Sequence, residues 1–149
     1  QTYPKDQFEI IVVNNDPSNL PPPAFSFPEN CRLINEEKPG SYAARNTALQ
    51  IACGSIIGFT DSDCIPDTQW IANAVAFLEK HPEFSRVAGK LQIIQSGATP
   101  TVVEKYNQLY SFPQEWLVNN GGGSVTGNLF TYRYVFEKVG NFDETLMSM

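Results

Sequence analysis

Two aspartates, Asp61 and Asp63, stand one residue apart directly after the apolar run at 56–59. Such a run beside a glycine is typical of a buried β-strand, and open α/β sheets bind ligands just beyond the carboxyl ends of their strands. Two close carboxylates repel each other unless a cation neutralises them, and proteins hold Mg²⁺ or Mn²⁺ with carboxylates plus substrate phosphates. The spacing therefore predicts a metal site that also holds a diphosphate. The alternative is an ordinary loop, because Asp and Ser are common turn residues.

Composition narrows the classes of partner. The chain has 149 residues, which suits one domain, and its 42% hydrophobic and 17% charged residues indicate a globular protein. A net charge of −6 argues against nucleic acid, whose binding needs clustered Lys and Arg. No apolar run approaches the ~20 residues of a membrane span. Three cysteines without Cys-x-x-Cys spacing argue against zinc and favour reduced thiols in the cytoplasm.

Two isolated polar residues are interpreted as structural. Cys64 lies beside the aspartates, but buried structural cysteines outnumber reactive ones, so we expect it to serve in packing. His81 precedes a proline where a helix should end, which favours a helix-end position over catalysis. A single histidine without a nearby nucleophile signature also argues against Ser-His-Asp or Cys-His chemistry.

The apolar pattern alternates between strand and helix periods. Strands are predicted over 8–13, 31–34, 56–59 and 86–94, and helices over 42–52, 69–80, 101–117 and 134–139. Ser41 is the expected N-cap of the helix over 42–52, Pro113 should kink or end the third helix, and the glycine-rich 119–123 should be flexible. Strands that alternate with helices predict an α/β fold with a mostly parallel sheet.

Further polar residues lie at the ends of these elements. Asn14 and Asn15 directly follow the first strand, where they could recognise a base or ribose, or form an Asx turn. Arg45 and Asn46 lie in the first turns of a helix, where a guanidinium suits a phosphate. A solvated helix face is the alternative for this pair.

Six segments occur in an order that is specific as a set. They are Tyr3-Pro4, the strand over 8–13 with Asn14 and Asn15, the segment 43–49, the segment 57–63, the segment 126–130 and the segment 139–144. In this order they resemble the family 2 glycosyltransferases of GT-A (Rossmann-like) fold. The resemblance covers nearly the whole chain.

The resemblance implies inverting transfer of a sugar from a nucleotide diphosphate sugar to the hydroxyl of a saccharide or lipid-linked saccharide, with Mg²⁺ or Mn²⁺. Asp61 and Asp63 match the family's DxD motif, which contacts the ribose and the metal. The other residues that the resemblance assigns to nucleotide-sugar binding are Asn14, Asn15, Arg45, Gly127 and Asn128.

The chain departs from the family pattern in three places. Asn14 and Asn15 stand where the family usually has an aspartate, which leaves the nucleotide open. The family's first strand, before Tyr3, and its acidic catalytic base, beyond Met149, are not in the sequence. We therefore expect residues 1–149 to be a partial catalytic domain, truncated at both ends, with no base assigned. Asp143 and Glu144 are expected to fix a turn.

The missing strand predicts that the chain pairs with a second copy, because exposed strand edges recruit other strands. In the whole protein, a peripheral membrane location is a further expectation. Two alternatives remain open for function. The chain could bind a nucleotide sugar without catalysis, or it could be a haloacid-dehalogenase-type phosphatase with Asp61 as nucleophile, although Ile65 departs from that motif.

Overall fold

The computed structural model describes residues 1–20, 22, 26–95, 97 and 99–146. They divide into two units, each of which is described by itself. The α1 unit comprises Thr2–Ile57 and Tyr132–Met149, and the α2 unit comprises Gln1 and Gly58–Thr131.

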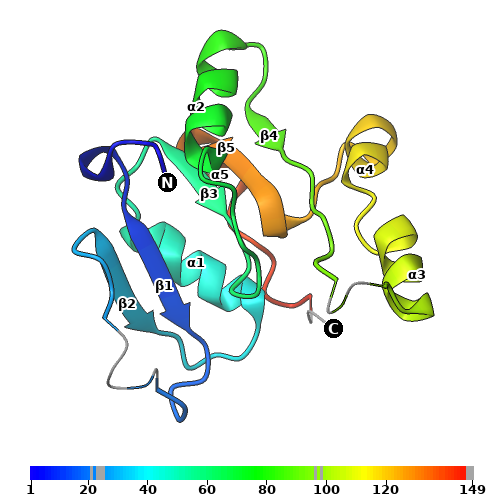
Figure 1. The fold of residues 1–149 in the computed structure, drawn as a ribbon. Helices are drawn as coiled ribbons and strands as arrows, with labels where there is room; N and C mark the ends of the chain where they lie inside the picture. Colours follow the sequence, from blue (N-terminus) through cyan, green and yellow to red (C-terminus); the bar gives the residue numbers. More distant parts are fainter. Residues whose placement is uncertain (21, 23–25, 96, 98, 147–149) are drawn as a thin grey trace. The chain divides into compact units, whose positions relative to one another are not determined.

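The α1 unit is built on a parallel strand pair. After the 3₁₀-helix η1 (Lys5–Gln7), β1 (Ile10–Asn14) pairs with β2 (Cys31–Asn35), with Ile10 opposite Cys31 and Asn14 opposite Asn35. Helix α1 (Ser41–Ile51) packs against β1 (Figure 1). The strand over 8–13 is therefore confirmed with shifted bounds, and Asn14 belongs to the strand.

The start of α1 differs from the prediction. Gly40 is the N-cap, and its φ of 120° is a backbone conformation that side chains with a Cβ rarely adopt. Ser41 is already helical, and its hydroxyl accepts a hydrogen bond from Arg45 Nη1 at 2.9 Å instead of capping the helix. The helical spacing of Ala44, Ala48, Ile51 and Ala52 in the sequence predicts that they form the packed face of this helix, but these residues are only half-buried. Ala43 and Asn46 are the buried residues of α1, so its packed face is rotated from the expected one.

The last helix of the α1 unit, α5 (Arg133–Val139), holds the end of α1. Arg133 donates from Nε to Gly54 O at 2.9 Å and from Nη2 to Ala52 O, so a cation lies at the carboxyl end of the helix. Gly140, with φ of 88°, ends α5 as predicted.

The α2 unit has its core under α2 (Trp70–Lys80). The sequence predicts a wide apolar face on this helix that includes Ala74, Val75, Phe77 and Leu78, and Ala74, Val75 and Leu78 are buried, Leu78 fully. Phe77, also expected in the core, is 37% exposed and stacks on Phe84. His81 is the C-cap residue of α2, as predicted.

A three-stranded sheet has the order β3 (Ile56–Phe59), β5 (Leu129–Tyr132), β4 (Arg86–Ala88), and the division between the units falls within β3 and β5. β4 and β5 are antiparallel, with Ala88 opposite Leu129. The predicted strand over 86–94 is wrong beyond Ala88. The pairing stops there because the 3₁₀-helix η2 (Thr126–Asn128) precedes the partner strand and leaves no extended backbone to pair with.

Two helices follow β4. They are α3 (Val102–Tyr110), which starts in a capping box between Thr101 and Glu104, and α4 (Gln114–Gly121), with Pro113 as its N-cap residue. The break before Pro113 confirms the predicted end. The expected flexibility of 119–123 is wrong for its first three residues, which are helical, and Gly122 caps the helix with φ of 61°.

The α/β class is confirmed, but the described strands are one parallel pair and a sheet with an antiparallel pair, rather than one mostly parallel sheet. Among the described residues, no helix combines the length and the hydropathy needed to cross a membrane.

Candidate functional site

The acidic loop, Asp61 to Cys64, directly follows β3 in the α2 unit. One ligand atom from each of Asp61, Asp63 and Cys64 lies within 4.8 Å of the other two. Both aspartates are exposed, and Cys64 is half-buried with its Sγ 3.9 Å from Asp63 Oδ1. Cys64, expected to serve in packing, thus lies at the edge of the acidic cluster.

The chemistry of the loop fits a hard divalent cation. Carboxylate oxygens are the ligands that Mg²⁺ and Mn²⁺ prefer, and two of them can hold such an ion while leaving positions for water and phosphate oxygens. A thiolate suits softer ions, so the two aspartates are the residues that would hold the metal. The described residues therefore fit the predicted Mg²⁺ or Mn²⁺.

Close packing fixes the strand that carries the acidic loop. A Cβ on Gly58 would lie 2.6 Å from the Phe130 ring, so only glycine lets β3 approach β5 this closely. The Phe130 ring also contacts the Trp70 ring, with centroids 4.5 Å apart. The aspartates thus follow a strand whose end is held by two aromatic side chains.

Gly127, predicted to bind the nucleotide sugar, lies beside Asp61. A Cβ on Gly127 would lie 3.1 Å from Asp61 Oδ2 and 3.3 Å from Leu91 Cδ1. The structure therefore brings Gly127 and the acidic loop together, at a distance where a larger residue would press on the carboxylate.

Asn128, the next predicted residue, has its side-chain amide bonded within the chain. Its Oδ1 accepts from Trp70 Nε1 at 2.8 Å, and its Nδ2 donates to Lys90 O at 2.9 Å. Buried Gln114 supports the same turn by donating to Gly89 O and Asn128 O, both at 3.2 Å. Nothing in the sequence around Gln114 singled it out.

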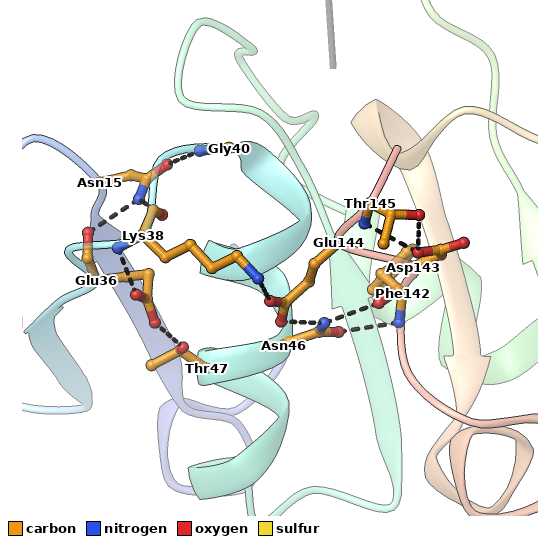
Figure 2. Close-up of polar contacts among 10 residues, drawn as sticks. All are labelled: Asn15, Glu36, Lys38, Gly40, Asn46, Thr47, Phe142, Asp143, Glu144 and Thr145. Atoms are coloured by element: carbon orange, nitrogen blue, oxygen red, sulfur yellow. Dashed lines mark hydrogen bonds and ion pairs between the residues drawn. The ribbon is translucent and has the colours of Figure 1, made fainter. Parts of the chain in front are cut away.

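The two asparagines at the end of β1 lie in the α1 unit. Asn15 donates to Glu36 O at 2.9 Å and Lys38 O at 2.7 Å, and it accepts from Gly40 N at 2.8 Å. It therefore holds the loop between β2 and α1 (Figure 2). Asn14 forms an Asx turn, in which its Oδ1 accepts from Asp16 N at 3.1 Å.

Arg45 lies over two aromatic rings in the α1 unit. Its Cζ is 5.8 Å from the centroid of Tyr42 and 5.9 Å from that of Phe142, and these two rings stack with centroids 5.9 Å apart. Its Nη1 bonds to Ser41. The guanidinium is thus oriented by groups from α1 and from the segment after α5.

A set of four residues, here named the Asn46 clamp, joins that segment to α1: Lys38, Asn46, Phe142 and Glu144 (Figure 2). Asn46 accepts from Phe142 N and donates to Phe142 O, both at 2.9 Å, and it donates to Glu144 Oε1 at 2.7 Å. Lys38 donates to the other Glu144 oxygen. Asn46 is 5% exposed, so the alternative of a solvated helix face is wrong for this residue.

Hydrogen bonds lower the pKa of several carboxylates of the α1 unit. Those from Asn46 and Lys38 lower the pKa of Glu144, and those from Thr47 and the Lys38 backbone lower the pKa of Glu36. The hydroxyl and backbone N–H of Thr145 lower the pKa of Asp143. The Asp143 carboxylate closes its own turn, as predicted.

Known proteins share this sequence pattern. The family model of Glycosyl transferase family 2 matches residues 1–140. Glycosyltransferase AglE of Haloferax volcanii is 33% identical over 99% of this chain and 50% of its own length. The probable glycosyltransferase YdaM of Bacillus subtilis is 24% identical over 98% of this chain and 38% of its own length. The chain thus spans half or less of these two relatives.

Solved structures share the fold. The crystal structure of residues 1–349 of S. aureus TarS superposes with a TM-score of 0.66 at 19% identity, over 99% of this chain and 44% of that chain. The same protein in complex with UDP-GlcNAc gives a TM-score of 0.61 at 18% identity, over 93% of this chain and 40% of that chain. The family match favours a transferase over the phosphatase alternative. With a family match over residues 1–140, the chain belongs to glycosyl transferase family 2.

Proposed function

We propose that the protein transfers a sugar from a nucleotide diphosphate sugar to an acceptor hydroxyl, with Asp61 and Asp63 holding Mg²⁺ or Mn²⁺. The observation that carries this proposal is the convergence of these carboxylates in a loop directly after β3, in a family 2 chain. A divalent ion bound there would stabilise the negative charge that develops on the departing nucleoside diphosphate.

The chain's own residues take distinct roles in this proposal. Arg45 contacts the diphosphate, since a planar guanidinium pairs well with phosphate oxygens. Asn14 contributes to recognition of the nucleoside, and Gly127 gives the donor sugar room beside Asp61. The amides of Asn15 and Asn128 bond within the chain: Asn15 holds the loop between β2 and α1 in the α1 unit, and Asn128 holds Trp70 and Lys90 in the α2 unit.

A uridine diphosphate sugar is the first donor to test, because a structure of similar fold was solved in complex with UDP-GlcNAc. We further propose that transfer inverts the anomeric centre, as the family resemblance implies. We also propose that residues 1–149 are part of a larger catalytic domain, because the chain spans half or less of its two curated relatives. The acceptor is a saccharide or a lipid-linked saccharide.

The test, on the full-length protein that includes this chain, is release of nucleoside diphosphate from UDP-, GDP- and dTDP-sugars with Mn²⁺ or Mg²⁺ and a panel of saccharide acceptors. We expect turnover with one nucleotide class, lost on chelation and in Asp63→Asn, with a product of opposite anomeric configuration by NMR. Asp6→Asn, an exposed aspartate of η1, is the matched control. Metal-dependent binding without turnover would favour a non-catalytic binding protein, and turnover that survives in Asp63→Asn would contradict the proposed metal site.

The expected pairing with a second copy is a separate proposal. Light scattering should give a mass of at least two chains, and a stable monomer would show that it is wrong.

A further inference from the structure

The Asn46 clamp connects to Arg45 through one side chain. Asn46 bonds both backbone polar groups of Phe142, which fixes where that residue lies on α1 (Figure 2). The fixed Phe142 ring stacks on Tyr42 at an interplanar angle of 16°, and it also contacts Phe136 with centroids 5.7 Å apart. The Arg45 guanidinium lies over the stacked pair.

The geometry limits how Arg45 can rotate. An arginine side chain carries about 2 kcal/mol of rotamer entropy, so an exposed guanidinium without neighbours samples many positions. Two ring faces within 6 Å attract the cation, and the bond to Ser41 Oγ directs one end of the planar group. Removal of the Phe142 ring takes away one of these three restraints and leaves the others.

The clamp also contacts the loop between β2 and α1, which Asn15 holds from the end of β1. Lys38, whose carbonyl accepts from Asn15, donates to Glu144, and Glu144 accepts from Asn46. A continuous set of contacts therefore runs from Asn15 to the segment after α5, within one unit. Its last member, Phe142, is the side chain that contacts Arg45.

We propose that Phe142, held by Asn46 and Glu144, is a positioning residue that orients Arg45 toward a nucleotide diphosphate. This inference rests on the proposed function, in which Arg45 contacts the diphosphate. The segment after α5 thereby determines donor affinity although it need not touch the donor. Orientation before binding strengthens an interaction by lowering the entropy lost when the ligand arrives.

A double-mutant cycle tests the proposal. Phe142→Leu keeps an apolar side chain but removes the ring, and UDP binding in the presence of Mn²⁺ is measured in the wild type and in Arg45→Ala. A cation–π contact of this kind corresponds to roughly a two- to fivefold change in affinity, so Phe142→Leu should weaken binding by that factor when Arg45 is present. In the Arg45→Ala background it should change binding by less than about 1.5-fold. An equal loss in both backgrounds would overturn the positioning role.

A second readout is independent of nucleotide. The Arg45 Nε–Hε signal in a ¹H–¹⁵N spectrum of the ligand-free protein reports the ring current of Phe142. It should move in Phe142→Leu and, by a smaller amount, in Glu144→Ala, which loosens the clamp without removing the ring. Tyr134→Leu is the matched control, because Tyr134 faces Lys138 at 5.0 Å outside the clamp.

The two proposals fail in different ways. A wild-type protein that binds no nucleotide diphosphate overturns the proposed function. An Arg45 signal that does not move in Phe142→Leu overturns the positioning role alone. If Phe142→Leu does not fold, the signal in Glu144→Ala decides, and an unmoved signal there overturns the role.

Discussion

The acidic loop and the Asn46 clamp are both rich in polar side chains, but they use them differently. In the acidic loop, exposed Asp61 and Asp63 each place a carboxylate oxygen within 4.8 Å of the other. In the clamp, buried Asn46 bonds three groups and Glu144 is paired with Lys38. A bound cation would relieve the repulsion between the two carboxylates of the loop. The polar side chains of the clamp already bond to one another. We infer that the loop serves binding and the clamp serves positioning.

The largest expected effect separates function from stability in the acidic loop. In the full-length protein, Asp61→Asn or Asp63→Asn should lower transfer activity at least about 100-fold, because a metal that stabilises the leaving diphosphate contributes several kcal/mol. Both side chains are exposed, so the free energy of unfolding should change by no more than about 0.5 kcal/mol. Activity assays and urea unfolding measure the two effects. A large loss of unfolding free energy in either variant would show that the acidic loop is a structural element.

The converse is expected in the clamp. Asn46→Ala removes three hydrogen bonds and leaves the N–H and C=O of half-buried Phe142 without these partners, which should cost about 3 kcal/mol of unfolding free energy. Urea unfolding measures this cost. Asn120→Ala, which removes one exposed bond to Trp116 O, is the control and should cost less than about 0.5 kcal/mol. Similar values for the two variants would show that the clamp adds no stability.

A smaller effect tests the packing of β3, the strand that precedes the acidic loop. Gly58→Ala places a methyl group 2.6 Å from the Phe130 ring, and such overpacking typically costs about 1–3 kcal/mol. Phe130→Leu in the same chain should relieve part of that cost. Gly123→Ala, where nothing lies within 4 Å of the new methyl group, is the control. An unchanged melting temperature in Gly58→Ala would contradict the close approach of β3 and β5.

The smallest expected effect is the pH dependence of the clamp. The pKa of Glu144 is lowered in the folded protein, so its ionised form contributes stability above the ordinary value of 4.5, and this contribution is lost as the pH falls through the lower folded value. Glu144→Gln should therefore destabilise the protein at about pH 7 and make little difference at about pH 3. Urea unfolding midpoints at both pH values measure this destabilisation. Glu83→Gln serves as the comparison variant. A difference that persists unchanged at about pH 3 would contradict the charge-based account.

The sequence was informative where local patterns determine the outcome. The apolar run before Asp61 predicted β3, and the apolar face of α2 predicted its buried residues Ala74, Val75 and Leu78. Aspartates one residue apart after a strand predicted the acidic cluster for the same reason, because the turn that follows β3, closed by the bond from Cys64 N to Asp61 O, keeps the two side chains close together.

Contacts between distant segments could not be predicted. Asn46 and Phe142 are 96 residues apart, and no local pattern indicates that an amide will bond that backbone. β5 was missed because its four residues follow a glycine- and asparagine-containing turn, although Leu129, Phe130, Thr131 and Tyr132 include strand-favouring types. The packing of β5 against Gly58 is a tertiary contact that no local pattern of the sequence indicates.

The most direct test of the account is calorimetric titration of the protein with UDP, with and without Mn²⁺. UDP should bind tightly only when the metal is present, and Asp61→Asn and Asp63→Asn should each abolish the metal-dependent part of the affinity while Asp6→Asn retains it. Equal UDP affinity with and without the metal, or full metal dependence in both loop variants, would contradict the claim that these two carboxylates hold the cation.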